Sequence, residues 1–143
     1  FGHIESRENR VDHILRLRDL QDLTGGFNAF IPLVFQTENN YLKVTAPVTA
    51  NEILKTYAIS RILLDNIPNI KAYWATSTVK LALIAQEFGA NDVDGTIEKE
   101  SIQSAAGAKS KYGVARDEFV ELIKNSGFTP VERDSIYNEL KVW

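Results

Sequence analysis

A strand–helix–strand pattern between Asn69 and Thr96 constrains the fold of this chain more than any other feature. Residues 70–75 are mostly β-branched, aromatic or alanine and predict a strand, and residues 77–88 carry the dense apolar pattern of a buried helix. Gly89 then ends the helix, because glycine readily takes the left-handed conformation found just past a helix end. A short second strand follows over residues 91–96. Two strands joined by one helix predict a parallel crossover unit with strands buried on both faces.

The rest of the chain repeats this alternation. Residues 1–5 read as the end of a strand, and Ser6 can cap the helix that follows and ends at residues 24–26. Residues 27–35 have strand length but contain Pro32, which removes a ladder donor. Thr49 and Glu52 match a capping box at the start of a helix that ends before Pro68.

The segments after the crossover unit extend the pattern. We predict a short helix over 98–108, a loop over 110–113, a helix over 115–126, an extended segment over 129–133 and a terminal turn or helix over 135–143. The expected fold is therefore α/β, with four parallel βα units and a short C-terminal helical tail. Four units can form a small open sheet or half of an eight-stranded barrel.

Composition excludes several classes of protein. With 143 residues, 44% hydrophobic, the chain is long enough for a single domain with a core. It has no cysteine, hence neither a disulfide nor thiolate ligands, and its net charge of −3 without a basic stripe argues against nucleic acid as a partner. The absence of a membrane-length apolar run and of a signal peptide predicts a cytoplasmic protein. Because the chain begins at Phe1 and lacks Met, we expect an upstream start.

Candidate site residues lie where the predicted strands end. The carboxyl ends of parallel strands carry the ligand site in α/β folds, and here they offer Trp74, Thr76, Asp94 and Thr96. Of Tyr73 and Trp74, which alternate, one can face a ligand while the other packs under helices. Asp92 shares a strand face with Asp94, and such a pair can hold a metal or hydrogen-bond a sugar, although Asp-Gly is equally a turn former.

The two other candidate groups lie earlier in the chain. His3 and Glu5 share a side of the first strand and could do acid–base work or bind a ligand, although His3 could equally be a polar residue at a strand end. Pro32 with Phe35 could form an apolar wall for a flat ring. The long polar segment 36–48 has the length of a binding loop. The sequence has no G-x-G-x-x-G or Walker pattern.

The chain contains several separated blocks of characteristic sequence, namely Gly2-His3-Ile4-Glu5 and residues 10–13, 20–33, 66–74, 88–96 and 130–138. Together these blocks resemble one enzyme family, the radical S-adenosylmethionine enzymes of the futalosine route to menaquinone and their deazaflavin-forming relatives. Within that family, Ala72-Tyr73-Trp74 and Asp94-Gly95-Thr96 look most like the aminofutalosine synthase branch.

The resemblance implies a cofactor and a set of binding residues. Gly2 and Glu5 would match the end of the S-adenosylmethionine-binding motif on the fifth barrel strand. The substrate-binding positions implied at or near strand ends are His3, Pro32, Trp74, Asp94 and Thr96. The family holds its [4Fe–4S] cluster with C-x-x-x-C-x-x-C, and this chain has no cysteine. Residues 1–143 would therefore be a single domain, the C-terminal half of a radical S-adenosylmethionine barrel, inactive by itself.

The expected function follows from that implication. The full-length protein would be a transferase that adds the 5′-deoxyadenosyl radical to the small-molecule substrate 3-[(1-carboxyvinyl)oxy]benzoate and gives aminofutalosine. The alternatives are the sister cyclase that closes dehypoxanthine futalosine, a deazaflavin-forming relative, or a non-catalytic, self-associating half-barrel. Half a barrel leaves strand edges and one sheet face uncovered, so we expect the missing N-terminal half or a second copy as partner, and no nucleic acid or membrane.

Overall fold

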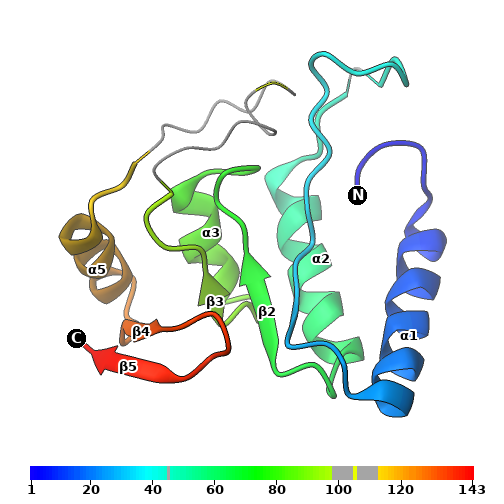
Figure 1. Ribbon diagram of the computed structural model, residues 1–143. Coiled ribbons are helices and arrows are strands. Elements are labelled where there is room, and N and C mark those ends of the chain that lie inside the picture. The colour runs from blue at the N-terminus through cyan, green and yellow to red at the C-terminus, as the bar shows by residue number, and fades with distance from the viewer. Residues whose placement is uncertain (45, 98–104, 106–112) are drawn as a thin grey trace.

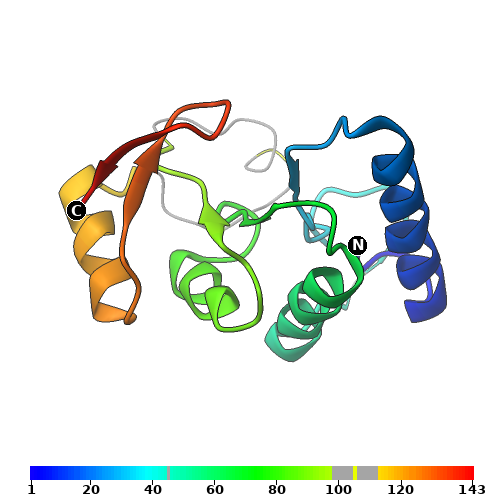
Figure 2. The ribbon, with the colours of Figure 1, turned by 90° about the horizontal axis from the view of Figure 1, so that it is seen from below.

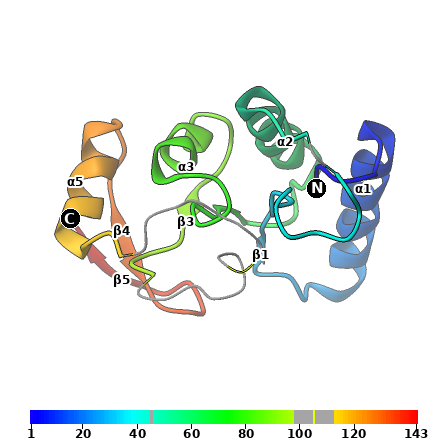
Figure 3. The ribbon, with the colours of Figure 1, turned by 90° about the horizontal axis from the view of Figure 1, so that it is seen from above.

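The computed structural model describes residues 1–44, 46–97, 105 and 113–143. Four helices in this part of the chain form a curved row, and the strands lie along its inner side (Figures 2 and 3). The helices are α1 (Arg7–Thr24), α2 (Ala50–Leu63), α3 (Val79–Gln86) and α5 (Arg116–Asn125). The strands are β1 (Ala29–Phe30), β2 (Asn69–Ala72), β3 (Asp92–Val93), β4 (Val131–Arg133) and β5 (Glu139–Val142). The predicted α/β class is confirmed.

Strands β1, β2 and β3 form a parallel sheet in that order. Ala29 pairs with Asn69 across β1 and β2, and Lys71 pairs with Asp92 across β2 and β3. The β2–α3–β3 crossover predicted from residues 69–96 is therefore present (Figure 1). Along β2, Ile70 and Ala72 are fully buried against the helices, whereas Lys71 points to the opposite, concave face of the sheet.

The first predicted strand is represented by Phe1 alone. The amino group of Phe1 donates to the carbonyl of Leu33 at 2.7 Å, and the N–H of Phe35 donates to the carbonyl of Phe1 at 2.8 Å. These two bonds follow the pattern of a parallel ladder. Strand β1 itself ends at Phe30, two residues before Pro32, which has no N–H to donate. The sheet thus has three strands in the described residues, and a fourth segment is in register beside the continuation of β1.

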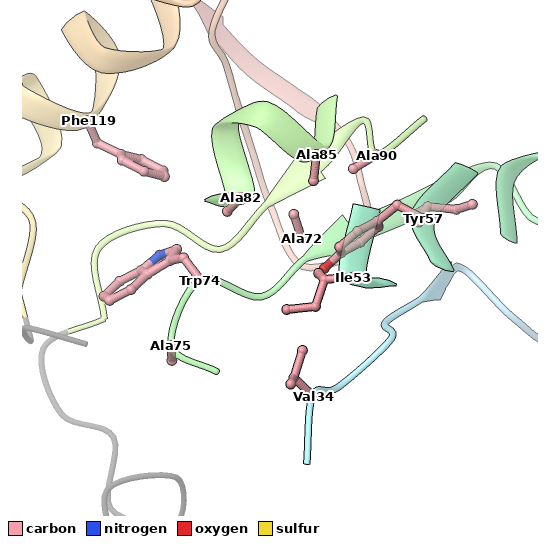
Figure 4. Close-up of a cluster of buried hydrophobic side chains, with 11 residues drawn as sticks. Val34, Ile53, Tyr57, Ala72, Trp74, Ala75, Ala82, Ala85, Ala90 and Phe119 are labelled. Atoms are coloured by element: carbon pink, nitrogen blue, oxygen red, sulfur yellow. The ribbon is translucent and has the colours of Figure 1, made fainter. Parts of the chain in front are cut away.

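The main core lies between β2 and the helices. Figure 4 shows Trp74 and Phe119 on one side of this cluster and Tyr57 and Ile53 on the other. The indole of Trp74 is fully buried. A second cluster of Ile14, Leu64 and Ile67 joins α1 to the end of α2. Burying an aromatic or large aliphatic side chain contributes about 1.5–3 kcal/mol, so these clusters fix the helices against the sheet.

Helix ends follow the predicted capping signals with one difference. Ser6 and Asn9 form a capping box at the start of α1, and the Thr49 hydroxyl accepts from the N–H of Glu52 at 3.3 Å. The Glu52 carboxylate binds the Arg7 guanidinium at 2.9 and 3.0 Å. It therefore ties α2 to α1, whereas in the predicted capping box the Glu52 side chain would hydrogen-bond back to Thr49. Gly89 has φ +97°, as predicted, and a Cβ there would overlap the side chain of Arg61.

The predicted C-terminal helical tail is wrong. Strands β4 and β5 form an antiparallel hairpin beside β3 and α5, with Val131 opposite Val142 (Figure 1). Asp134 organises the turn, because its carboxylate accepts from the backbone N–H groups of Ile136 and Asn138, both at 2.9 Å. The alternation of Glu139, Leu140, Lys141 and Val142 is the period-two pattern of a strand, and the Asp134 turn outweighs any helical preference there.

Two further expectations concern segments rather than contacts. The predicted helix over 98–108 and the loop over 110–113 lie outside the described residues, apart from Ala105 and Gly113. None of the described helices has both the length and the apolar character needed to cross a membrane.

Candidate functional site

Two groups of polar side chains lie at the strand ends. The first is the amino-terminal turn, residues 1–5, which precedes α1. The second is the charged cluster, which lies on the concave face and consists of Lys71, Asp92, Asp94, Arg133 and Tyr137. Each group has a carboxylate with a cation beside it, but their hydrogen bonding differs.

Glu5 is the centre of the amino-terminal turn. One of its oxygens accepts from the N–H of Gly2 at 2.6 Å and from the Arg10 guanidinium at 2.9 Å, and the other accepts from the N–H of His3 at 3.0 Å. Burial by itself raises the pKa of Glu5, but the donors of Gly2, Arg10 and His3 outweigh it and lower that pKa to about 2. Glu5 therefore remains ionised and holds the turn closed.

Gly2 and His3 are fixed by neighbours within this chain. Gly2 has φ +94°, and a Cβ there would overlap Cγ2 of Val48. The Nδ1 of His3 accepts from the N–H of Ile4 at 2.7 Å, and the His3 ring meets the ring of Phe35 edge to face at 5.6 Å. His3 and Glu5 are close, with 3.3 Å between Nδ1 and Oε2, but they meet within a turn and not on one side of a strand as predicted, because Glu5 accepts from the N–H groups of Gly2 and His3.

These contacts test how well the turn fits S-adenosylmethionine. The N–H groups of Gly2 and His3 already donate to Glu5, so they are not free for a ligand. Glu5 keeps one acceptor position, on Oε2, because Oε1 already accepts two hydrogen bonds. The turn therefore fits a ligand that donates one hydrogen bond to Oε2, and the contacts of Gly2 and Glu5 with S-adenosylmethionine stay predictions.

In the charged cluster, Lys71 faces both aspartates. Its Nζ lies 3.3 Å from Oδ1 of Asp94 and 3.7 Å from Oδ2 of Asp92. The prediction that Asp92 and Asp94 share a strand face is confirmed, since one lysine on the neighbouring strand reaches both. Among the described residues, no three His, Asp or Glu side chains gather as metal ligands.

Arg133 of β4 neutralises Asp92. Its Nε and Nη2 donate to the two Asp92 oxygens at 3.0 and 2.7 Å, and the Tyr137 hydroxyl donates to Oδ2 at 2.9 Å. The guanidinium also lies 4.0 Å from the centre of the Tyr137 ring. Burial and the Asp92 carboxylate together raise the pKa of Tyr137 to about 12, so its hydroxyl stays protonated and donates.

Asp94 is held less completely than Asp92. Its Oδ1 faces Lys71, whereas Oδ2 is buried and has no hydrogen-bond partner in the described residues. Burial raises the pKa of Asp94 above its ordinary value, and Lys71 opposes that rise only in part. A carboxyl group in this state can take up a proton, and its Oδ2 can accept a hydrogen bond from a ligand.

The other predicted substrate-binding residues differ in exposure. Trp74 is fully buried, and its indole N–H donates to the carbonyls of Asp94 and Gly95 at 3.0 and 3.2 Å, so it fixes the backbone next to Asp94. Pro32 is also buried, whereas Ile31 and Leu33 on either side are exposed. Thr96 is exposed and lines a cavity of about 520 Å³ together with Asp94. Direct ligand contacts of these residues stay predictions.

Sequence reasoning missed Lys71, Arg133 and Tyr137. Lys71 had a usable signal, because it is a charged residue in the middle of an otherwise apolar strand and must face something other than the helix layer. Arg133 and Tyr137 had no such signal, since their partner Asp92 lies 41 and 45 residues away.

Comparisons with known proteins show which sequences this chain is similar to. A family model described as the CofH/MqnC C-terminal region matches residues 24–142. The chain is 45% identical to the aminodeoxyfutalosine synthase of Thermus thermophilus, a match that covers 100% of the chain and 40% of that protein. It is 38% identical to the cyclic dehypoxanthine futalosine synthase of Streptomyces coelicolor, over 99% of the chain and 35% of that protein.

A third relative has another activity. The chain is 39% identical to the 5-amino-6-(D-ribitylamino)uracil–L-tyrosine 4-hydroxyphenyl transferase of Methanococcoides burtonii, over 99% of the chain and 42% of that protein. The chain therefore spans about two fifths of the length of these relatives. Because the family model matches most of the chain, the chain belongs to the CofH/MqnC C-terminal region family.

Proposed function

We propose that this chain is the C-terminal part of an aminofutalosine synthase. The observation that carries the proposal is its similarity, over its whole length, to an aminodeoxyfutalosine synthase at 45% identity, against 38% for the cyclase and 39% and 42% for the transferases of Methanococcoides burtonii and Archaeoglobus fulgidus. The reaction would add the 5′-deoxyadenosyl radical to 3-[(1-carboxyvinyl)oxy]benzoate and, after rearrangement and loss of carbon dioxide, give aminofutalosine. In that enzyme S-adenosylmethionine, bound to a [4Fe–4S] cluster, would supply the 5′-deoxyadenosyl radical.

The residues of this chain would bind and orient the two reactants. Glu5 would accept a hydrogen bond from S-adenosylmethionine at its remaining Oε2 position, while Gly2 keeps the turn in place. On the concave face, Asp94 would accept a hydrogen bond from substrate, with Thr96 at the rim of the same cavity. His3, Pro32 and Trp74 would complete the substrate site, Trp74 through the backbone of Asp94 and Gly95.

The half-barrel architecture is part of the proposal. It is supported by the sequential order of the parallel strands and by a groove along the edge of β3 that no other described strand pairs with. Residues 91–96 line this groove from one side and Phe119, Ile123 and Pro130 line it from another. Gln86 also lines it and has a buried side-chain N–H2 without a partner among the described residues. An extended segment lying parallel to β3 would pair with that edge and could supply a carbonyl to Gln86.

The preceding part of the longer protein would provide that segment, and a second copy of this chain is the alternative partner. Ile31 and Leu33 are 40% and 45% exposed on the side of the sheet away from the helices, where such a partner would cover them. Analytical ultracentrifugation of the 143-residue chain should therefore show dimers or larger species. A compact, non-aggregating monomer at micromolar concentration would support a self-sufficient open sheet.

The function is tested by assaying the full-length protein with each candidate substrate. We expect aminofutalosine from the carboxyvinyl ether of benzoate and no product from dehypoxanthine futalosine or from the ribitylaminouracil with tyrosine. Product from either of those substrates instead would reassign the chain to the corresponding relative. The 143-residue chain alone should form no 5′-deoxyadenosine, because it has no cysteine to ligate the cluster.

A further inference from the structure

Two aspartates of the charged cluster compete for one lysine. Lys71 Nζ lies 3.3 Å from Asp94 and 3.7 Å from Asp92, so a small rotation of the lysine side chain would exchange the nearer partner. The side chains of Lys71 and Asp92 are only 16% and 9% exposed, so solvent screens this choice weakly. Another group must therefore determine which of the two aspartates pairs with Lys71.

Arg133 is placed to make that decision. It occupies both oxygens of Asp92, at 3.0 and 2.7 Å, and a bidentate guanidinium–carboxylate pair is among the strongest charge-assisted hydrogen bonds. Tyr137 adds a third donor to Asp92 at 2.9 Å. Because its charge is balanced and its acceptor positions are largely filled, Asp92 attracts Lys71 only weakly.

We propose that Arg133 is a positioning residue for the Lys71–Asp94 pair: by engaging both oxygens of Asp92, it keeps the only lysine of the cluster on Asp94. The functional meaning of this inference rests on the proposed role of Asp94 in substrate binding. The geometry itself does not depend on that role. It gives the C-terminal hairpin a part in the site, because Arg133 lies on β4 and acts across 41 residues of sequence on β3.

Four charged or titratable groups of the described residues act on Asp94. They are Lys71 on β2, Asp92 on β3, Arg133 on β4 and, from the helix side, Tyr57 on α2, whose pKa is raised to about 12 chiefly by burial and further by the Asp94 charge. Lys71 and Arg133 favour the ionised form of Asp94, and Asp92 disfavours it. Loss of Arg133 should therefore act on Asp94 twice, through its own lost charge and through departure of Lys71 to Asp92.

The test follows the titration of the Asp94 carboxyl carbon by NMR and needs no substrate, so a wrong assignment of function would not affect it. Arg133→Gln should move the Asp94 pKa upward by about one unit. Asp92→Asn should move it downward, because Lys71 then has a single carboxylate to serve. In the Asp92→Asn background, Arg133→Gln should have less than half of its single-variant effect. Arg116→Gln, at another arginine lining the same cavity, is the matched control and should leave the value unchanged.

The same variants can overturn the proposal. If Arg133 merely docks the hairpin and does not hold Lys71 on Asp94, Arg133→Gln leaves the Asp94 pKa unchanged. If Arg133 acts on Asp94 only through space, its effect is undiminished in the Asp92→Asn background. Either result refutes the positioning role, and the Asp92→Asn arm remains informative should Arg133→Gln fail to fold.

Discussion

Glu5 and Asp94 are both carboxylates at the ends of strand segments, and each lies beside a cation. Their surroundings nevertheless shift their pKa values in opposite directions. Glu5 accepts from two backbone N–H groups and from Arg10, which lower its pKa to about 2. Asp94 has only Lys71 on one oxygen and none of the described donors on the other, and burial raises its pKa. The number of donors that face a carboxylate, and not the presence of a cation, decides whether it is a structural anchor or a responsive group.

The comparison implies that the amino-terminal turn is rigid. Gly2→Ala should therefore have the largest effect on stability, about 3 kcal/mol, because it combines overlap with Val48 and a non-glycine residue at φ +94°. Gly25→Ala is the control, since its φ is +60° but no atom lies within 4 Å of an added Cβ, and it should cost about 1 kcal/mol. Equal losses in urea unfolding would show that the Val48 contact is soft.

Removing the charge of Glu5 should have the second largest effect on stability. Glu5→Gln weakens hydrogen bonds to Arg10 and to two backbone donors, and we expect a loss of about 2 kcal/mol. The matched change Glu52→Gln removes another carboxylate bound to an arginine, but Arg7 is 76% exposed in side-chain area, so solvent screens the pair and its loss should be clearly smaller than that of Glu5→Gln. Similar values from chemical denaturation would contradict the anchor role of Glu5.

A third prediction compares the two aspartates of the cluster. Asp94→Asn at neutral pH should change the free energy of unfolding by less than about 1 kcal/mol, because Oδ2 has no described donor to lose and the buried charge disappears. Asp92→Asn should cost about 2 kcal/mol, since the charge-assisted pair with Arg133 is weakened. Thermal unfolding of both variants checks the order, and a larger loss for Asp94→Asn would reverse the roles assigned to the two residues.

The pH dependence of stability should separate Glu5 from Asp94 by sign. The pKa of Glu5 is lower in the folded chain than its ordinary 4.5, so its contribution is present above pH 4.5 and is lost as the pH falls toward 2. The pKa of Asp94 is raised above 3.8, so its contribution declines as the pH rises through that region. Unfolding curves of Glu5→Gln should show a smaller loss of stability on the acid side, because Glu8, Glu52 and Asp134 also have lowered pKa values, and those of Asp94→Asn should keep the full loss.

Much of the fold could be predicted because its signals are local. The crossover at residues 69–96, the Ser6 cap and the left-handed Gly89 each depend on neighbours in sequence, and each is present. The prediction of a helical C-terminal tail failed because a turn held by one side chain, Asp134, makes this short segment of alternating apolar and polar residues the second strand of a hairpin.

The site was predicted less completely because the state of each charged side chain depends on partners that are distant in the sequence. The sequence put Asp92 and Asp94 on one face, but it could not show that Arg133 satisfies the first and leaves the second with only Lys71. Likewise, alternation showed that Tyr73 and Trp74 face opposite sides. It did not decide which of them is buried, and the structure assigns that place to Trp74.

The long reach of the Arg133–Asp92 contact also sets an order of assembly during synthesis. Asp92 leaves the ribosome 41 residues before Arg133. At about 5–20 residues per second, that separation corresponds to roughly 2 to 8 seconds. During this interval β2 and β3 can pair, but one lysine faces two aspartates. The electrostatic state of the concave face is therefore completed only when the hairpin has been made, so a nascent chain has its parallel sheet before it has its final distribution of charge.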